Sequence, residues 1–221
     1  MKIYIVRHGE RGIGVSNDIL TEKGLQQTKK TSEFFKDKKI DKIFSSSYNR
    51  AKQTAIEIQK TIGCEIEFTE LLNEPSLGIF ESKPVKEWKE AFKESGQTIE
   101  QYRPPSGENR YDAYTRAKQF IKKIKSENSE EIIIVSHGGL ISDLISLLHQ
   151  EPIEASNKYK TNFCSITTIQ LNEDKNIEHA DINNKTHLEN YWSPANVIPS
   201  AGTTLYISLT PPTVKSAVLP V

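Results

Sequence analysis

The fold of this chain is decided near its N-terminus, by the stretch Ile3-Tyr4-Ile5-Val6-Arg7-His8-Gly9-Glu10. Its first half is a short, β-rich apolar run that ends abruptly in charged, polar and glycine residues. Such a run predicts a buried strand that delivers polar side chains at its carboxyl end, where ligands bind in open α/β sheets. There Arg7 can hold phosphate oxygens in a bidentate grip while the neutral imidazole of His8 attacks the anion. The stretch alone does not exclude a structural role for both residues.

A second stretch repeats the pattern far along the chain. It reads Glu131-Ile132-Ile133-Ile134-Val135 and ends in Ser136-His137-Gly138-Gly139. If both runs are parallel strands of one sheet, His8 and His137 reach the same edge and one ligand. The glycine after each histidine lets the backbone approach that ligand and lets a helix begin at once, which makes Gly138 a candidate phosphate-binding residue. Two such junctions favour a shared anion site over a structural role.

Composition and charge bound the class of protein. A chain of 221 residues fits one α/β domain of ordinary size with a full core. Its 29 basic and 29 acidic residues cancel, so nucleic acid and anionic membranes are not expected partners. Cys64 and Cys164 lack metal-type spacing and fit reduced thiols of a cytoplasmic protein. We expect no signal peptide and no membrane helix, because the chain opens on a strand and no apolar run approaches about 18 residues.

Hydrophobic periodicity predicts strands alternating with helices, which indicates an α/β fold. One helix is expected from about Thr21, its N-cap, to Lys36, with Leu25, Thr28 and Phe35 on the inner face. The other helices are expected from Arg50 onward, over 111–125 and over 140–149. Further strands are expected over 41–47, 64–68, 162–171 and 177–181, and the strand over 162–171 is expected to be antiparallel or near a sheet edge.

Two polar residues near the predicted sheet edge have open roles. Asn17 ends a Gly-rich loop that follows His8, and its side-chain amide could donate to a bound anion. Arg50 falls in the first turn of a helix, where the macrodipole mildly disfavours a cation. That position suits Arg50 if it meets an anion attracted to the helix N-terminus, but a solvated Arg50 fits the sequence equally well.

Glu74 is the candidate proton donor. It precedes a proline in an otherwise apolar, loop-like stretch, where partial exclusion of water favours the protonated carboxyl that a general acid needs. A surface carboxylate is the alternative. The segment 82–107, with Trp88, Phe92 and the Pro104-Pro105-Ser106-Gly107 turn, predicts a helical insertion that covers the site.

Six segments of the chain resemble motifs of the histidine phosphatase superfamily and follow one another in the same order as in that family. The members of this superfamily share the phosphoglycerate mutase-like fold. The matching segments are Arg7-His8-Gly9-Glu10, Leu20-Thr21-x-x-Gly24-x-x-Gln27, Ser45 through Arg50-Ala51-x-Gln53-Thr54-Ala55, Leu72-x-Glu74-x-x-x-Gly78, Ser106-Gly107-Glu108 and Ser136-His137-Gly138-Gly139. The resemblance covers about residues 1–190. It implies a catalytic domain over this range, built as a three-layer α/β/α sandwich around a mostly parallel sheet.

The resemblance also implies roles for individual residues. His8 would attack phosphorus to give a phosphohistidine, while Arg7, Arg50 and His137 bind the phosphoryl oxygens. Glu74 would protonate the leaving oxygen and then activate water. The residue types present indicate the same roles without the resemblance, because phosphoryl transfer needs an in-line nucleophile, cationic donors and a proton source. No metal or other cofactor is expected.

The sequence departs from the family pattern at several points. The loop from Glu10 to Leu20 is short and carries Arg11 where a Thr-x-Trp-Asn sequence often follows the glutamate, which puts the equivalence of Asn17 in doubt. Ser82 replaces a common glycine. The residues after Glu74 are Pro-Ser-Leu-Gly and lack the basic-aromatic form typical of the mutases. These departures favour a phosphatase over a mutase.

Two alternatives stay open beside a phosphatase. One is a phosphoglycerate mutase-type isomerase, and the other is a non-catalytic phospho-ligand module on the same fold. The second fits less well because His8, Glu74 and His137 are all present. The expected partner is a small phosphorylated substrate. The tail 191–221 favours β-structure over 203–209, and it is expected to add an edge strand, to contact a second copy in a homodimer or to be loosely ordered.

Overall fold

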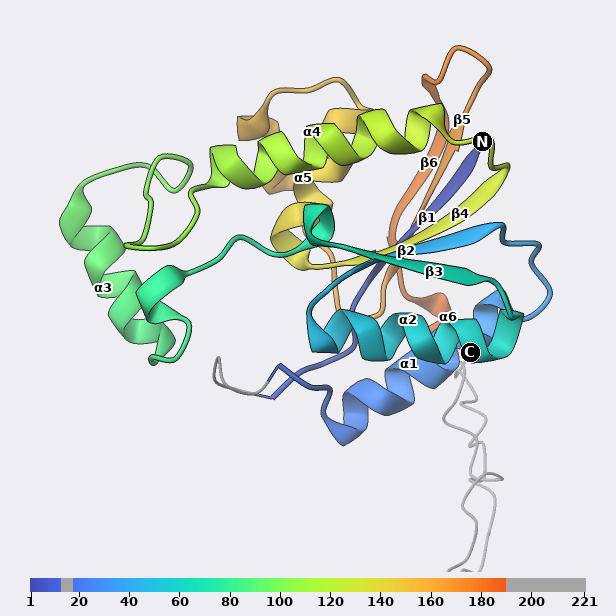
Figure 1. Cartoon of the computed structure of the whole chain (residues 1–221), viewed down its shortest axis with the longest axis horizontal. Helices are drawn as coiled ribbons and strands as arrows, with labels where there is room; N and C mark the ends of the chain where they lie inside the picture. The colour runs from blue at the N-terminus through green and yellow to red at the C-terminus, as the bar shows by residue number, and fades with distance from the viewer. Residues whose placement is uncertain (13–17, 190–221) are drawn as a thin grey trace, which may run out of the picture. The chain divides into compact units, whose positions relative to one another are not determined.

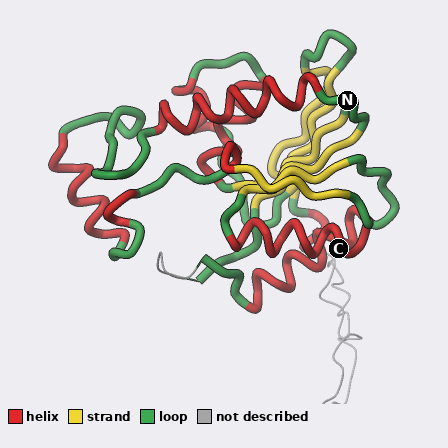
Figure 2. Tube along the Cα trace, viewed as in Figure 1, coloured by secondary structure: helices red, strands yellow, loops and turns green. Residues whose placement is uncertain are grey.

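A six-stranded sheet forms the centre of the computed structural model, which describes residues 1–12 and 18–189 (Figures 1 and 2). The strand order is β3-β2-β4-β1-β5-β6. The pairs β3·β2, β2·β4 and β4·β1 are parallel, and the pairs β1·β5 and β5·β6 are antiparallel. The strands are β1 (Lys2–Arg7), β2 (Lys42–Ser46), β3 (Glu65–Thr69), β4 (Glu131–Ser136), β5 (Ile166–Leu171) and β6 (Ile177–Asn184).

Helices cover both faces of this sheet, with α4 and α5 on one side and α1 and α2 on the other (Figure 1). The α-helices are α1 (Glu22–Phe35), α2 (Asn49–Ile62), α3 (Val85–Ser95), α4 (Arg110–Ser126), α5 (Gly138–Leu148) and α6 (Thr186–Glu189). Three short 3-10 helices are η1 (Glu70–Leu72), η2 (Gly78–Phe80) and η3 (Ile153–Lys158). The predicted α/β fold, with helices on both faces of a mostly parallel sheet, is confirmed.

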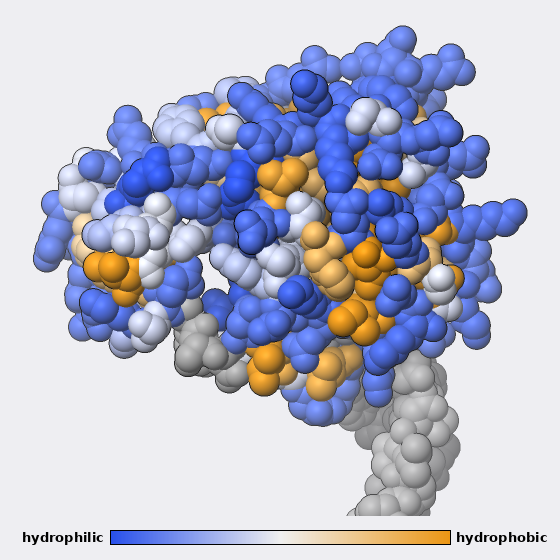
Figure 3. Space-filling model, in the orientation of Figure 1, coloured by the Kyte–Doolittle hydropathy of each residue, from blue (hydrophilic) through white to orange (hydrophobic). Residues whose placement is uncertain are grey.

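Side-chain alternation along the central strands creates two cores. In β1, Ile3 and Ile5 pack with α4 and α5, whereas Tyr4 and Val6 pack with α1 and α2. All four side chains are buried, and burial of a side chain of this size stabilises the fold by roughly 1.5–3 kcal/mol. The continuous apolar runs in β1 and β4 are therefore explained by burial on both faces. Apolar residues on the face drawn in Figure 3 form only scattered groups among hydrophilic ones.

The inner face of α1 differs from the prediction at one residue. Thr28 and Phe35 are buried as predicted, but Leu25 is 40% exposed. The buried stripe of α1 instead begins at Gly24, where an added Cβ would lie 2.1 Å from the Glu10 carbonyl oxygen. Because α1 packs so closely through Gly24, the next residue is turned about 100° away from the core.

The late strands also differ slightly from expectation. β5 begins at Ile166, later than the predicted residue 162, and Cys164 just before it has a φ of 53°. This left-handed turn redirects the chain before the strand starts. No helix among the described residues is long and apolar enough to cross a membrane. The predicted tail strand over 203–209 lies outside the described residues.

Candidate active site

The register of β1 and β4 brings two histidines together. Arg7 pairs with Ser136, so His8 and His137 leave neighbouring parallel strands at the same edge of the sheet. Their ring centroids are 5.0 Å apart. Both side chains are nearly inaccessible, since His8 is 3% exposed and His137 is 1% exposed. The two imidazoles therefore lie close together, as the sequence predicts.

A hydrogen bond to the backbone fixes the tautomer of His8. Nδ1 lies 2.7 Å from the Gly9 carbonyl oxygen, which can only accept, so Nδ1 carries the proton. The lone pair is therefore on Nε2. Gly9 holds this geometry because it packs against the start of α1, where an added Cβ would lie 2.7 Å from the Gly24 carbonyl oxygen. The imidazole is thus presented in the tautomer that a nucleophile needs.

His137 has the opposite tautomer. Its Nε2 lies 2.7 Å from the Ser46 hydroxyl, and that hydroxyl donates to Asn73 Oδ1 at 2.7 Å. Ser46 therefore accepts from the imidazole, so the proton is on Nε2 and the lone pair is on Nδ1. Asn73 Oδ1 also accepts from the Ser47 backbone and hydroxyl, at 3.0 Å each. The turn after β2 and the residue before Glu74 together fix the orientation of His137.

Arg50 joins the two histidines. Its Nε donates to His137 Nδ1 at 3.1 Å and lies 3.3 Å from His8 Nε2, in agreement with both tautomers. The Arg50 side chain is 11% exposed, so the structure excludes the solvated alternative. Asp18 pairs with its Nη1 and also accepts from the Asn49 backbone N–H at 2.7 Å. Asp18 thus caps α2 and holds the guanidinium over the site.

Burial and neighbouring cations keep both imidazoles neutral. Burial, followed by the charge of Arg50, lowers the pKa of His8 from 6.5 to about 3. The same two causes, in the same order, hold the pKa of His137 well below 6.5. A bound phosphate dianion acts in the opposite direction, because an opposite charge favours the protonated imidazole. The ligand-free site therefore holds unprotonated histidines among arginines.

Arg7 presents a donor that has no protein partner. Its Nη1 donates to the Thr161 carbonyl oxygen at 2.5 Å, and the guanidinium lies 4.2 Å from the centroid of Phe163. Its Nε is buried without a hydrogen-bond partner among the described residues. Gly138 lies directly against it, since an added Cβ would be 3.2 Å from Arg7 Cζ. A buried, unsatisfied guanidinium N–H is costly unless a ligand accepts from it.

Glu74 reaches the same region from the loop between η1 and η2. Its Oε1 and Oε2 accept from the backbone N–H groups of Gly139 and Leu140, at 3.2 Å each. These are first-turn N–H groups of α5, which have no partner within the helix. Glu74, Arg7 and Gly138 line one cavity of about 610 Å³. Four residues of the 82–107 segment, Trp88, Ile99, Tyr102 and Pro104, also line it.

Sequence reasoning missed several residues that hold this site. Ser46 is the last residue of β2, at the start of a hydroxyl-rich stretch, and Asn73 directly precedes Glu74, so position alone offered a signal for both. Asp18 and Thr161 offered none, because their contacts join segments remote in sequence. Asn17 lies outside the described residues. Among the described residues, no group of three or more His, Cys, Asp or Glu side chains could hold a metal ion.

Comparisons with known proteins found a matching family model, relatives and solved structures. The model of the histidine phosphatase superfamily (branch 1) matches residues 3–184. A relative named "Probable phosphoglycerate mutase GpmB" from Erwinia tasmaniensis is 29% identical over 185 residues, covering 76% of this chain and 84% of the relative. A relative named "Putative phosphoserine phosphatase 2" from Hydrogenobacter thermophilus is 29% identical over 185 residues, covering 79% and 91%. The α-ribazole phosphatase structure from Shigella flexneri has a TM-score of 0.75 at 23% identity, covering 83% of this chain and 96% of that one.

Proposed function

The chain belongs to the histidine phosphatase superfamily (branch 1), and we propose that it hydrolyses phosphate monoesters through a phosphohistidine formed on His8. The observation that carries this proposal is the fixed tautomer of His8, whose Nδ1 donates to the Gly9 carbonyl oxygen and leaves the Nε2 lone pair for attack. In the ligand-free site the lowered pKa of His8, about 3, keeps that lone pair unprotonated across the physiological range.

In the first step His8 Nε2 donates its electron pair to phosphorus while the bond to the leaving oxygen breaks. Arg7, Arg50 and His137 surround the phosphoryl group, and their N–H donors stabilise its equatorial oxygens as charge redistributes. Arg50 Nε, which lies between the two histidines in the free site, turns to the phosphoryl oxygens. The protonated carboxyl of Glu74 gives its proton to the leaving oxygen, which departs as an alcohol.

In the second step water attacks the phosphohistidine. Glu74, now a carboxylate, accepts a proton from that water, phosphorus forms a bond to the water oxygen, and the N–P bond breaks. The electron pair returns to His8 Nε2, and inorganic phosphate leaves. Positive charge comes from Arg7 and Arg50, so the reaction as proposed needs no metal ion.

Hydrolysis is favoured over isomerisation by the loop that carries Glu74. A mutase must hold a second acidic group of its substrate, and the basic-aromatic form typical of that branch is absent here. Instead Pro75 and Leu77 line the cavity beside Glu74, and the aromatic residues Trp88 and Tyr102 of the 82–107 segment line it as well. This apolar part of the lining suits the uncharged part of a phosphate monoester, while Arg110 and Lys160 line the cavity as well.

Phosphate release from a panel of monoesters, with a chelator present, tests the proposal. The panel includes p-nitrophenyl phosphate, 3-phosphoglycerate, sugar phosphates and a phosphotyrosine peptide, each assayed with the protein and with His8→Ala. We expect release that the variant abolishes, together with a phosphoryl-sized mass increase on the native protein alone after a rapid acid-free quench. Isomerisation of 3-phosphoglycerate without phosphate release would make the protein a mutase, and silence on the whole panel would favour a phospho-ligand module.

A further inference from the structure

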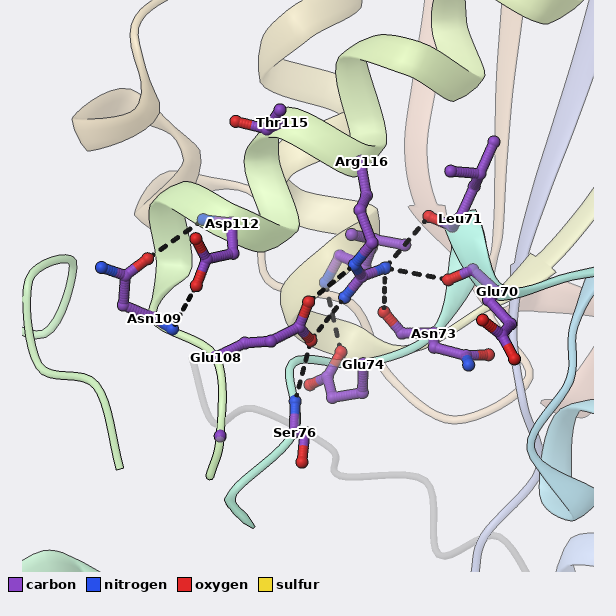
Figure 4. A network of polar contacts seen from close by, with 12 residues as sticks. Glu70, Leu71, Asn73, Glu74, Ser76, Glu108, Asn109, Asp112, Thr115 and Arg116 are labelled. Carbon is purple, nitrogen blue, oxygen red and sulfur yellow. Dashed lines mark hydrogen bonds and ion pairs between the residues drawn. The ribbon is translucent and has the colours of Figure 1, made fainter. Parts of the chain in front are cut away.

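Glu74 lies on a segment that regular secondary structure does not support. The segment runs from the end of η1 to the start of η2, and it must hold a carboxyl group within reach of a leaving oxygen. Contacts from other parts of the chain therefore decide where Glu74 lies, and Figure 4 shows them converging on Arg116. Arg116 projects from α4 and does not line the cavity.

One edge of the Arg116 guanidinium holds the chain just before Glu74. Nη1 lies 3.0 Å from the Glu70 carbonyl oxygen, 3.3 Å from that of Leu71 and 3.1 Å from that of Asn73. The Glu70 carbonyl also accepts from the Asn73 N–H at 3.0 Å, and the Leu71 and Asn73 carbonyls lie at and just beyond the end of η1, where a cation is well suited to collect them. Only the backbone carbonyl of Asn73 takes part in this contact, because its side chain, which orients the Ser46 hydroxyl against His137, is held separately by Ser46 and Ser47.

The other edge holds the chain just after Glu74, through Glu108. Arg116 Nε and Nη2 donate to the two carboxylate oxygens of Glu108 at 2.9 and 2.8 Å, as a bidentate pair. Glu108 in turn accepts from the Ser76 backbone N–H at 3.1 Å, and its own N–H donates to the Ser76 carbonyl oxygen at 2.9 Å. Glu74 is thus held on both sides by one guanidinium and its carboxylate.

Two further features make this arrangement stiff. The paired side chains of Arg116 and Glu108 are only 19% and 28% exposed, so water screens the ion pair little. The segments that meet there touch backbone to backbone. An added Cβ at Gly78 would lie 2.1 Å from the Pro105 carbonyl oxygen, and one at Gly107 would lie 2.7 Å from that of Ser76. Neither segment can shift alone.

We propose that Arg116 is a positioning residue for the proton-transfer step, acting through Glu108 and the backbone on both sides of Glu74. The proposal rests on the proposed function, in which Glu74 is the general acid. Substitution of Arg116 should release the Glu74 loop without changing the phosphate-binding arginines. A displacement of about 1 Å at a reacting group costs on the order of 10²-fold in rate.

The test compares leaving groups, because a general acid matters most when the leaving oxygen is a poor one. We would measure kcat/KM, which reports the first phosphoryl transfer, for p-nitrophenyl phosphate and for an alkyl phosphate. We expect Arg116→Met to lose roughly 10²-fold on the alkyl phosphate and far less on p-nitrophenyl phosphate. Arg116→Lys should recover only part of the loss, since an ammonium cannot replace the planar fork.

A matched control on the same helix separates positioning from general support of α4. Lys123 pairs with Glu67 of β3 and does not contact the Glu74 loop, so Lys123→Met should leave both rates unchanged. Thermal unfolding of each variant checks that the fold is retained. Equal losses by Arg116→Met on both substrates, or no loss on either, would overturn the proposal.

A double variant distinguishes failure of this inference from failure of the proposed function. If Glu74→Gln selectively slows the alkyl phosphate, Glu74 is the acid, and adding Arg116→Met should then cost little more on that substrate. Fully additive losses would show that Arg116 acts elsewhere while Glu74 remains the acid. If Glu74→Gln slows both substrates equally, the assigned role of Glu74 fails, and the role inferred for Arg116 falls with it.

Discussion

Acidification should destabilise this fold through the imidazole of His8. In the unfolded chain His8 titrates near its ordinary pKa of 6.5, whereas burial and Arg50 lower its pKa in the folded chain to about 3. Above the unfolded value neither state binds the proton, and full stability is present. As the pH falls below 6.5 the unfolded chain takes up a proton that the folded chain excludes, so stability is lost until the folded pKa is reached.

The magnitude follows from linkage. One proton bound by the unfolded state alone changes the free energy of unfolding by about 1.4 kcal/mol per pH unit, so His8 costs about 2 kcal/mol between pH 6.5 and pH 5. His8→Asn removes this contribution and retains that of His137, whose pKa is also lowered. The difference between the two proteins therefore isolates one imidazole.

Urea unfolding of the protein and of His8→Asn, at a series of pH values from about 7.5 to about 5, measures that difference. We expect the free energy of unfolding of the native protein to fall more steeply, with the two curves diverging by about 2 kcal/mol at the acid end. Parallel curves would refute the reasoning, because they would mean that His8 binds protons equally in both states.

Three substitutions test other contacts of the site. Gly138→Ala places a methyl group 3.2 Å from Arg7 Cζ. We expect kcat/KM for p-nitrophenyl phosphate to fall on the order of 10-fold at an unchanged melting temperature. An unchanged kcat/KM would argue against a role of Arg7 in transition-state binding. Asp18→Asn removes the charge partner of Arg50. We expect turnover to fall also on the order of 10-fold, while inorganic phosphate inhibits the variant at least as strongly as it inhibits the native protein. An unchanged turnover would show that Asp18 does not orient Arg50. Gly78 has a φ of 56°, and a Cβ added there would lie 2.1 Å from the Pro105 carbonyl oxygen. Gly78→Ala should therefore lower the free energy of unfolding, measured in urea, by roughly 1–3 kcal/mol. A smaller change would mean that the facing segments separate easily.

The sequence predicted the parts of the fold that depend on local pattern. Continuous apolar runs identified β1 and β4, and the glycine after each run marked where the chain turns into the site. Parallel pairing of those strands then places His8 beside His137, so the centre of the site followed from two short stretches. The sequence predicts the position of Arg50 at the start of a helix, but it does not decide whether the side chain faces the anion site or solvent. That orientation depends on the contact with Asp18, which lies 32 residues away in sequence.

The remaining features depend on contacts that no local pattern records. Arg116 reaches carbonyl groups more than forty residues earlier in the chain, and a backbone carbonyl carries no sequence signal. Helical periodicity predicts Leu25 in the core because it gives the repeat of the buried stripe but not the exact rotation of the helix about its axis. The close approach at Gly24 sets that rotation, and it becomes apparent only once the two backbones are in contact.

The separation of the sheet edge from the 82–107 segment has an evolutionary consequence. The two histidines and two arginines are anchored by strand register and helix starts, so the proposed reaction centre should tolerate sequence change in the part of the cavity formed by Trp88, Ile99 and Tyr102. Descendants of such a scaffold can acquire new substrates by recombination within that segment alone. The splice points must fall before Pro105, because the residues from there to Glu108 are bound to the loop that carries Glu74 and are inherited with it.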